Sequence, residues 1–474
     1  MFSLALSKPD ILNLVYLLAA AMFILGLKML ASVKTAPKGN LVSSLGMLLA
    51  TVATFFFIAD TQWWSLIWVG LAILIGAGVG LYLALTVQMT GMPQMVALLN
   101  GFGGVASLLV ACGDYALKEV GTSTWDSLLP TGLATLIGGI TLTGSLMAYG
   151  KLQGTSWAPD RPVQFMGQKA LIFIMLLGMI ALSGVMATQP DATGLNSFLL
   201  VVIALVSLVL GVLLVVGIGG ADMPVVVSLL NAYSGLAAAM AGFVLNNSAL
   251  IITGSLVGAS GLILTNIMCK AMNRSLMNVL FGGVGGAKAA SGGTGVQGTH
   301  REFSIEDACI ILDAAQRVMV VPGYGMAVAQ AQHIVKELAI ELDRRGITVN
   351  YAIHPVAGRM PGHMNVLLAE AGVPYDQLLD LDQSNAELEH TDVAIVIGAN
   401  DVTNPAARTD QSSPLYGMPI LNVDQARTVF VIKRSMNPGF AGIQNELYFH
   451  ENCGMIFGDA KKVVGHLNAE LADQ

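Results

Sequence analysis

A short glycine-containing run in the second half of the chain has the spacing of a phosphate-binding turn. The apolar stretch 318–321 leads into Pro322-Gly323-Tyr324-Gly325-Met326-Ala327-Val328, and an amphipathic stretch follows. GxGxxV between a strand and a helix is the context that a dinucleotide fingerprint requires. Gly323 would permit the tight turn, Gly325 would let the backbone approach a pyrophosphate, and the small Val328 would allow close helix–strand packing. The run predicts a dinucleotide site; the alternative is a purely structural glycine turn.

Two further features favour a phosphorylated dinucleotide. An NAD site places Asp or Glu at the end of the second strand to hold the ribose 2′-hydroxyl, whereas the stretch 348–353 ends without an acid and continues into His354. Lys433-Arg434-Ser435 follows the last predicted strand, and such a cluster suits a 2′-phosphate dianion. These residues predict NADP(H) as the bound cofactor, although Lys433 and Arg434 could also form an ordinary solvated edge.

Other chemistry-bearing residues also follow predicted strands. Gly398-Ala399-Asn400-Asp401 closes one strand, and His354 to Arg359 follows another. Ligands of open α/β sheets bind at such strand ends. Asp401 could hydrogen-bond the nucleotide or take a proton, Arg359 could pair with a phosphate, and His354 is expected to titrate near neutral pH. Each residue alone is more often a loop cap, but their convergence at one sheet edge favours a site.

The elements that position these residues are those of a soluble α/β Rossmann-like domain with a parallel sheet, over residues 301–474. Short apolar runs alternate there with amphipathic stretches, the pattern of a parallel α/β sheet. The expected strands are Val318–Val321, Thr348–Ile353, Val393–Ile397, Ile420–Val423 and Val429–Ile432, and the expected helices span 304–315, 326–344, 361–371 and 459–472.

The first part of the chain, residues 1–274, reads as an α-helical polytopic membrane domain. Only 11% of the chain's residues are charged, against about 25% in soluble proteins. A bilayer-spanning helix needs about 20 mostly apolar residues. Nine such runs occur, at 11–32, 41–58, 64–87, 93–112, 128–148, 168–187, 196–218, 224–245 and 249–269.

The placement of Lys and Arg predicts the orientation of these spans. With the N-terminus outside, Lys34, Lys38, Lys151, Arg161, Lys169, Lys270 and Arg274 flank the cytoplasmic side, and only Lys8 and Lys118 lie outside. Nine spans then leave the C-terminal domain in the cytoplasm. That domain carries 12 Lys or Arg against 22 Asp or Glu, so nucleic acid is a poor partner for it.

An internal repeat marks polar residues inside the membrane domain. The pattern Met-Pro-x-x-Val-x-Leu-Leu-Asn-x-x-x-Gly-x-Ala occurs at 92–106 and at 223–237, and Thr-Gly-Ser-Leu occurs at 143–146 and at 253–256. Asn100 and Asn231 are equivalent in the repeat, Ser145 lies on a neighbouring span, and Asp222 lies at the cytoplasmic mouth of the eighth span. Polar residues are costly in a bilayer and therefore suggest a polar path, although each alone could simply hold helices together.

The remaining features of the sequence are less specific. Residues 282–298, GGVGGAKAASGGTGVQG, predict a flexible linker within 275–300. The four cysteines are far apart and suggest neither a disulfide framework nor a metal site. All seven histidines lie at or beyond residue 300, so a proton route through the membrane half would use Asn, Ser, Thr, water or a group from another chain.

Taken together, the residues resemble the beta-subunit family of proton-translocating NAD(P) transhydrogenases along nearly the whole chain. The most specific stretches are 220–231, 268–275, 322–332, 354–370 and 433–437. The resemblance implies that this chain binds NADP(H), that an alpha subunit binds NAD(H), and that hydride passes directly between the two nicotinamides. Protons would enter the cytoplasm as NADPH forms.

The resemblance also assigns roles to individual residues. Asn231, Ser145, Asp222 and Gly261 match membrane positions implicated in coupling, and His354 and Asp401 match positions implicated in redox-linked protonation. The matching nucleotide-binding positions are Gly323, Tyr324, Gly325, Arg359, Lys433 and Arg434. Some relatives carry a membrane histidine where this chain has Asn100. A small extra membrane subunit could supply that histidine here. The family further implies a homodimer in the bacterial inner membrane.

Two other classes of protein share parts of this pattern. A transporter or channel gated by a cytoplasmic nucleotide-binding domain would combine the same spans with the same α/β domain, but it predicts a conduction motif or a broken-helix substrate site, and neither is clear in the sequence. A membrane anchor for a soluble NADP-binding regulator would need no paired polar residues in its spans. An NAD(H)-binding partner that co-purifies and completes hydride transfer would distinguish the transhydrogenase from both.

Overall fold

The computed structural model describes residues 8–30, 35–58, 63–118, 122–159, 162–219, 222–281, 299–413, 415–439 and 442–473. The chain divides into two compact units. The first, called here the helical unit, comprises Met1–Ala158, Phe165–Val216 and Leu229–Ile263, and the second comprises Pro159–Gln164, Gly217–Ser228 and Leu264–Gln474. Each unit is described by itself below.

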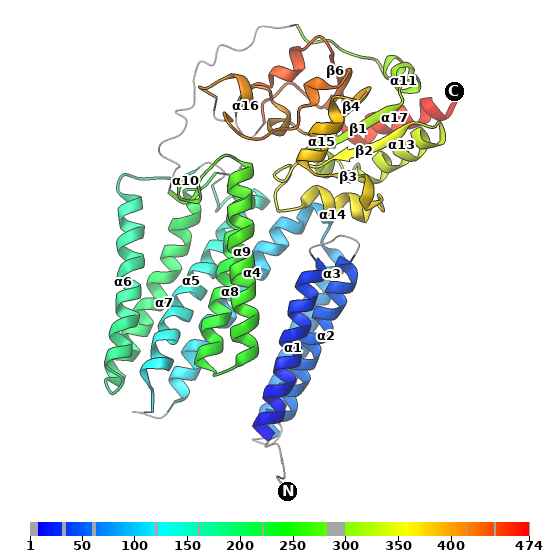
Figure 1. The fold of residues 1–474 in the computed structure, drawn as a ribbon. Helices are drawn as coiled ribbons and strands as arrows, with labels where there is room; N and C mark the ends of the chain where they lie inside the picture. The colour runs from blue at the N-terminus through cyan, green and yellow to red at the C-terminus, as the bar shows by residue number, and fades with distance from the viewer. Residues whose placement is uncertain are drawn as a thin grey trace. The chain divides into compact units, whose positions relative to one another are not determined.

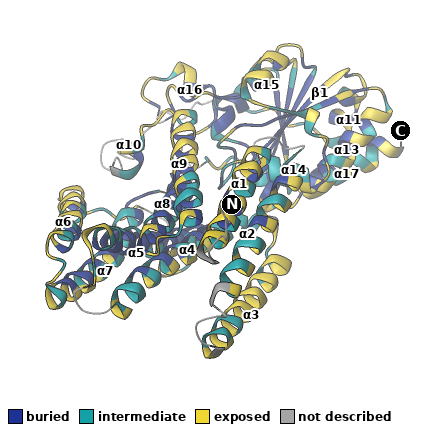
Figure 2. Cartoon of the chain, turned by 60° about the horizontal axis from the view of Figure 1, so that its bottom comes forward, coloured by how far each residue is buried: buried dark blue, intermediate teal, exposed yellow. Residues whose placement is uncertain are grey.

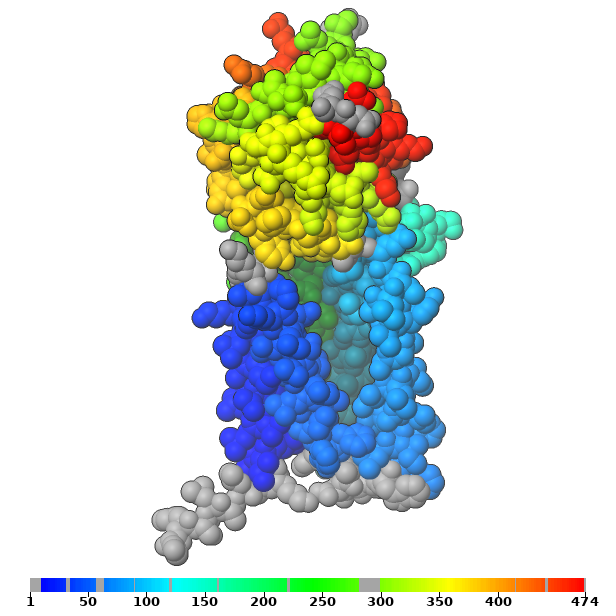
Figure 3. Space-filling view, turned by 90° about the vertical axis from the view of Figure 1, so that its right-hand side faces the viewer, coloured from blue at the N-terminus to red at the C-terminus, as the bar shows by residue number. Residues whose placement is uncertain are grey.

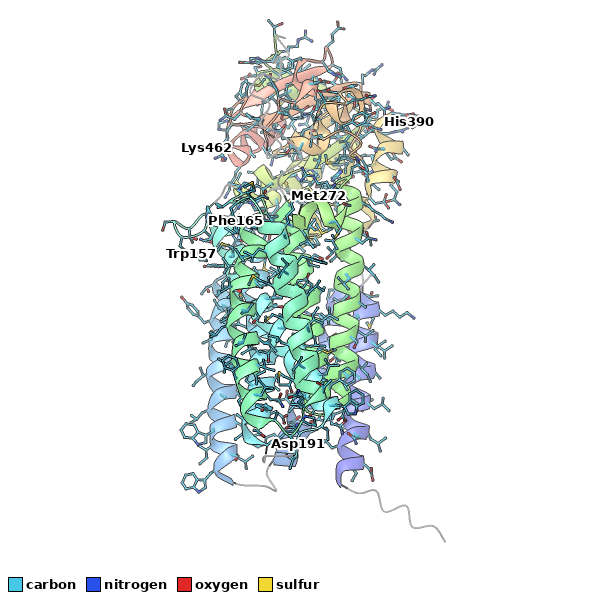
Figure 4. All side chains as sticks on the ribbon, turned by 90° about the vertical axis from the view of Figure 1, so that its left-hand side faces the viewer. Trp157, Phe165, Asp191, Met272, His390 and Lys462 are labelled. Carbon is cyan, nitrogen blue, oxygen red and sulfur yellow. The ribbon has the colours of Figure 1, made fainter. Side chains whose placement is uncertain are left out.

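Nine helices among the described residues are long and apolar enough to cross a membrane, as the sequence predicted (Figure 1). They are α1 (Lys8–Leu30), α2 (Ala36–Ile58), α3 (Trp63–Thr86), α4 (Met92–Leu117), α5 (Trp125–Gln153), α6 (Gln168–Thr188), α7 (Thr193–Val216), α8 (Met223–Val244) and α9 (Ser248–Ala271). Trp157 and Phe165 lie at one end of the helical unit and Asp191 at the other (Figure 4). The chain is therefore a multi-pass membrane protein.

The nine helices differ sharply in how much of their surface the chain itself covers. Helix α5 is the most buried of them and packs against α4, α6 and α7. In contrast, no residue is buried in the most apolar stretch of α3 (Figure 2). Small residues allow the close approaches. A Cβ added to Gly104 of α4 would lie 2.7 Å from the Gly138 carbonyl oxygen of α5, and one added to Gly235 of α8 would lie 2.5 Å from the Gly258 nitrogen of α9. Such contacts are typical of helix association in lipid.

The structure supports one half of the internal repeat. Helices α4 and α8 begin at Met92-Pro93 and Met223-Pro224, so Asn100 and Asn231 stand at the same distance from their helix starts. Proline suits a helix start because its φ is already helical. The second match is not equivalent in the structure, because Thr143 lies late in α5 whereas Thr253 lies early in α9.

The predicted linker, 275–300, is only partly described. It begins with a short helix, α10 (Leu276–Phe281). Residues 282–298 lie outside the described residues, and the predicted domain boundaries at 274 and 301 stay predictions.

The C-terminal part of the second unit contains a parallel sheet, as expected, and the sheet has six strands among the described residues. The strands are β1 (Arg317–Pro322), β2 (Thr348–Ala352), β3 (Leu378–Leu379), β4 (Val393–Ile397), β5 (Thr428–Lys433) and β6 (Cys453–Phe457). Their order, β3-β2-β1-β4-β5-β6, is that of a doubly wound dinucleotide-binding sheet. Every residue of β4 is buried, because strands with helices on both faces see no solvent.

Helices and 3-10 turns connect and cover these strands. They are α11 (Ile305–Asp313), α12 (Tyr324–Val328), α13 (Gln332–Arg344), α14 (His363–Glu370), η3 (Tyr375–Gln377), α15 (Leu381–Leu388), η4 (Asp401–Thr403), α16 (Ala406–Thr409), η5 (Val423–Gln425), η6 (Glu446–Phe449) and α17 (Ala460–Asp473). Helix α17, red in Figure 3, packs against α13 and α11.

The structure corrects the predicted elements in three places. The strand expected at 420–423 is absent, because β5 already pairs with β4 along its length, and the Leu421 amide instead donates to the Val402 carbonyl at 2.9 Å. Strands β3 and β6 and helix α15 were not predicted. The helix expected over 326–344 is broken between α12 and α13, where Gln330 adopts a left-handed φ of 49°.

Candidate functional site

A cavity of about 260 Å³ lies where four parallel strands end. Its walls follow the carboxyl ends of β1, β4, β5 and β6, which is where open α/β sheets bind their ligands. The cavity is lined by Gly325, Val328, Ala329, Gly398, Ala399, Asn400, Ile432, Lys433, Arg434, Ser435, Asn437, Pro438, Gly458, Asp459 and Ala460. It therefore brings together seven of the predicted cofactor-binding residues: Gly325, Val328, Gly398, Asn400, Lys433, Arg434 and Ser435.

The glycine-rich turn after β1 is held against the loop after β4. The Gly323 amide donates to the Ile397 carbonyl at 2.9 Å, and the Gly325 amide donates to the Gly398 carbonyl at 3.0 Å. A Cβ at Gly325 would lie 2.7 Å from the Gly398 Cα, closer than packed carbon atoms allow. A Cβ at Gly323 would come even closer to the Ala399 Cα. The chain's own backbone therefore requires glycine at 323 and 325, a constraint that the fingerprint alone did not reveal.

The third position of the fingerprint does not have its predicted packing role. Val328 is 45% exposed and lines the cavity, so it does not allow close contact between helix and strand. Met326 and Ala327 are fully buried, and neither lines the cavity. The residues of this turn that line the cavity are Gly325, Val328 and Ala329.

The cationic side of the cavity is formed by the last residue of β5 and the loop that follows it. Lys433 is half-buried, Arg434 is exposed and Ser435 is half-buried. Burial lowers the pKa of Lys433, and the carboxylate of Asp401 opposes that shift. Two cations and a hydroxyl on one wall can bind a phosphate dianion by charge-assisted hydrogen bonds.

The loop that adjoins Lys433, residues 458–460, contributes lining residues that the sequence analysis missed. Asp459 precedes α17, and its Oδ1 accepts hydrogen bonds from the Lys461 and Lys462 amides at 3.2 and 3.3 Å. Because β6 was not predicted, nothing placed the loop 458–460 at the same sheet edge as the others. The available signal was the Gly458-Asp459 pair directly after the apolar run 453–457, since Gly and Asp are common at such boundaries.

Tyr324 and Arg359 contact each other but do not line the cavity. The Arg359 guanidinium carbon lies 4.3 Å above the Tyr324 ring, which is a cation–π distance. His363, which the sequence analysis did not select, lies beside Tyr324 with ring centroids 6.2 Å apart. Its Nδ1 accepts from the Arg359 amide at 3.2 Å, and burial lowers its pKa to about 4. These three side chains form one group after β1 and β2.

The expectation that His354 titrates near neutral pH is wrong. Its ring is buried, its Nδ1 accepts from the Val356 amide at 3.2 Å, and its Nε2 lies 2.8 Å from the Pro419 carbonyl. Nε2 must therefore carry the proton of a neutral ring. Burial lowers the pKa of His354 to about 4, although the bond to Pro419 partly opposes this. Asp401, in η4, lies next to the cavity residue Asn400 but does not itself line the cavity.

The helical unit brings four of the predicted membrane residues onto neighbouring helices. Asn100 of α4 and Ser145 of α5 are buried, and a Cβ on the adjacent Gly101 would lie 3.2 Å from the Ser145 Cβ. The Ser145 hydroxyl is buried and has no hydrogen-bond partner among the described residues. On the next pair of helices, Gly261 of α9 lies against Ala232 of α8, the residue that follows Asn231.

Asp222, just before α8, is held by an arginine that follows α9. Arg274 donates from Nη1 to both carboxylate oxygens of Asp222, at 3.0 and 2.8 Å. Burial raises the pKa of Asp222, and Arg274 partly offsets that rise. The pair can therefore respond to changes in the position of Arg274, because loss of the arginine would leave a buried carboxylate that favours protonation.

These features define a class: a multi-pass membrane protein that carries an α/β domain with a cavity at the strand ends, where such domains bind dinucleotides. Comparison with known proteins narrows the class. Residues 12–470 match the family described as NAD(P) transhydrogenase beta subunit. Two curated proteins of Rhodospirillum rubrum, both named NAD(P) transhydrogenase subunit beta, are each 48% identical over 456 residues, which cover 94% of this chain and 96% of the relative.

The chain belongs to the NAD(P) transhydrogenase beta-subunit family. Membership makes it a component of an oxidoreductase that uses pyridine nucleotides, and a beta subunit implies an alpha subunit as its partner. The resemblance seen in the sequence is thereby confirmed.

Proposed function

We propose that this chain is the NADP(H)-binding subunit of the transhydrogenase, and that an alpha subunit binds NAD(H) and exchanges hydride with it. The observation that carries this proposal is the cavity at the ends of β1, β4, β5 and β6, where the last residue of β5 and the loop after it offer Lys433, Arg434 and Ser435 together. The end of β2 carries His354 and no carboxylate that would hold a free ribose 2′-hydroxyl.

The residues present fit a bound NADP(H). Gly325 and Gly398 keep the floor of the cavity free of side chains, so a pyrophosphate can approach the backbone. Lys433, Arg434 and Ser435 would hold the 2′-phosphate, and Asn400 would hydrogen-bond the nucleotide. Arg359 and Tyr324 would contribute from outside the cavity. The nicotinamide would supply the hydride chemistry, so this chain's residues bind and orient the cofactor.

We further propose that hydride transfer is coupled to proton movement into the cytoplasm through the helical unit. Asn100, Ser145 and Asn231 offer polar groups inside a set of apolar helices, and Gly261 lies beside this group. Asp222 would take up a proton at the cytoplasmic mouth as Arg274 withdraws and would release it as Arg274 approaches. Asp401 would bind or release a proton as the oxidation state of the cofactor changes. His354 could take up a proton only at Nδ1, which would require loss of the hydrogen bond from the Val356 amide; the bond from Nε2 to the Pro419 carbonyl could remain.

We also propose a membrane orientation and further partner subunits for the chain. The N-terminus would lie outside and the C-terminal domain in the cytoplasm of a bacterial inner membrane, in accord with the Lys and Arg placement. A small extra membrane subunit would supply the titratable group that is absent at Asn100. The membrane part would form a homodimer.

The nucleotide preference provides the direct test. The purified full chain is expected to bind NADPH much more tightly than NADH, as measured by calorimetry in detergent. Arg434→Ala should weaken NADPH binding about tenfold and leave NADH binding nearly unchanged, because only NADPH carries the dianion and a hydrogen bond to a charged group contributes about 1.5–3 kcal/mol.

Equal binding of the two nucleotides by the unmodified chain would refute the proposal. Arg427→Ala is the matched control, since Arg427 is strongly exposed and does not line the cavity. It should leave both affinities unchanged.

A further inference from the structure

A buried tyrosine outside the cavity connects two of its loops. Tyr448 in η6 is 1% exposed, and the Lys433 ammonium lies 5.0 Å from the centre of its ring. The side-chain amide of Asn400 is oriented so that its nitrogen faces a hydrogen-bond acceptor and its oxygen faces donors. In this orientation Nδ2 donates to the Tyr448 hydroxyl at 3.0 Å. Oδ1 then accepts from Lys433 Nζ at 3.2 Å and from the Gly439 amide at 2.6 Å.

A second side chain of the same segment fixes the backbone of Asn400. Asn445 is fully buried, and its Nδ2 donates to the Asn400 carbonyl at 3.0 Å and lies 3.3 Å from the Thr403 hydroxyl. The segment 445–449 therefore holds Asn400 at both its main chain and its side chain. Buried amides and hydroxyls are costly to leave without hydrogen-bond partners. This arrangement therefore allows Asn400 few other conformations.

We propose that Tyr448 is a positioning residue that places Lys433 for the 2′-phosphate by orienting the amide of Asn400. The inference rests on the proposed NADP(H) site and deepens it. The hydroxyl of Tyr448 is the acceptor that keeps Asn400 Nδ2 turned away from Lys433, which leaves Oδ1 to face the ammonium. The aromatic ring adds a second attraction for the same cation. Phenylalanine at position 448 would keep the ring and remove only the acceptor.

The test is a double-mutant cycle on the full chain in detergent, with NADPH and NADH affinities measured by calorimetry. Tyr448→Phe should weaken NADPH binding about fivefold and change NADH binding little, which reduces the preference for NADPH. Asn400→Ala should also weaken NADPH binding. If Tyr448 acts through Asn400, adding Tyr448→Phe to Asn400→Ala should have no further effect, because coupled residues are not additive.

Tyr351→Phe is the matched control. Tyr351 is fully buried in β2, and its hydroxyl has no hydrogen-bond partner among the described residues, so this change should leave both affinities intact. An unchanged NADPH preference in Tyr448→Phe, or an additive effect in the double variant, would overturn the inference. If Tyr448→Phe does not fold, an unchanged NADPH preference in Asn400→Ala would overturn it as well.

A lack of NADPH preference in the unmodified chain has a different meaning. It would refute the proposed function itself, and with it the site on which Tyr448 acts.

Discussion

At the scale of single residues, burial decides what the histidines near the cavity can do. His354 and His363 are each 2% exposed, and each has a pKa lowered to about 4, chiefly because burial disfavours the charged ring. In His354 both ring nitrogens are within hydrogen-bond distance of backbone groups. These histidines are thus neutral parts of the folded domain at physiological pH.

This neutrality predicts a pH-dependent stability. In the unfolded chain a histidine titrates near pH 6.5, so between pH 6.5 and 4 the unfolded state binds more protons than the folded state. Stability is therefore complete above pH 6.5 and falls as the pH decreases through this window, by up to roughly 3 kcal/mol for each histidine. Hydrogen exchange of the β1, β4 and β5 amides in the full chain, corrected for intrinsic rates, measures the loss.

Single substitutions separate this effect from general acid denaturation. His354→Gln should flatten the slope, because Gln cannot acquire the proton. His390→Gln is the control, since His390 lies exposed on the surface (Figure 4), and it should keep the original slope. An unchanged slope in His354→Gln would contradict the assignment.

At the scale of elements, the packing of α8 on α9 depends on small residues. A Cβ at Gly261 would lie 2.8–2.9 Å from the nitrogen, Cα and Cβ of Ala232. Gly261→Ala must therefore push the two helices apart, beside Asn231. Overpacking of this kind costs about 1–3 kcal/mol. We expect a lower thermal midpoint in detergent and weaker proton coupling in vesicles that contain the complete enzyme.

A glycine on another membrane helix provides the matched control for this substitution. Gly76 of α3 has nothing within 4 Å of an added Cβ, so Gly76→Ala should leave both the thermal midpoint and the coupling unchanged. If Gly261→Ala and Gly76→Ala had the same thermal midpoint and the same coupling, the close contact between α8 and α9 would not be needed for stability or coupling.

At the scale of the whole molecule, the segment 282–298 joins the last membrane helices to the α/β domain. Its sequence contains eight glycines and no large apolar side chain, and the prediction of a linker rests on this composition. A chain without residues 282–298 should bind NADPH as before, because every residue of the cavity lies outside this segment. We propose that coupling requires the α/β domain to move between two poses as the cofactor changes its oxidation state. The shortened chain should therefore lose NADPH-dependent proton uptake in vesicles.

A second variant tests whether coupling depends on the length of segment 282–298 or on its particular residues. A replacement of 282–298 by a Gly/Ser segment of equal length should recover the coupling. Normal proton uptake in the shortened chain would contradict a moving domain.

The sequence by itself determined the nine membrane helices and most of the parallel sheet, because hydropathy over about 20 residues and short apolar runs are local properties. It also placed Gly325, Asn400 and Lys433 at strand ends, since each lies within four residues of the end of an apolar run. It predicted a strand at 420–423, where Leu421 is buried but its amide donates to the Val402 carbonyl rather than to a strand. Apolar character indicates burial, but a strand also needs a free neighbouring edge.

Only the tertiary structure decided which of the predicted residues share one cavity and in what chemical state. The short β3 and the late β6 form because the existing sheet presents edges to them, and β6 brings Asp459 to the cavity. The neutral ring of His354 and the contact of Tyr448 with Asn400 depend on groups 65 and 48 residues away. Burial and long-range hydrogen bonds are properties of the assembled fold, so no local pattern in the chain encodes them.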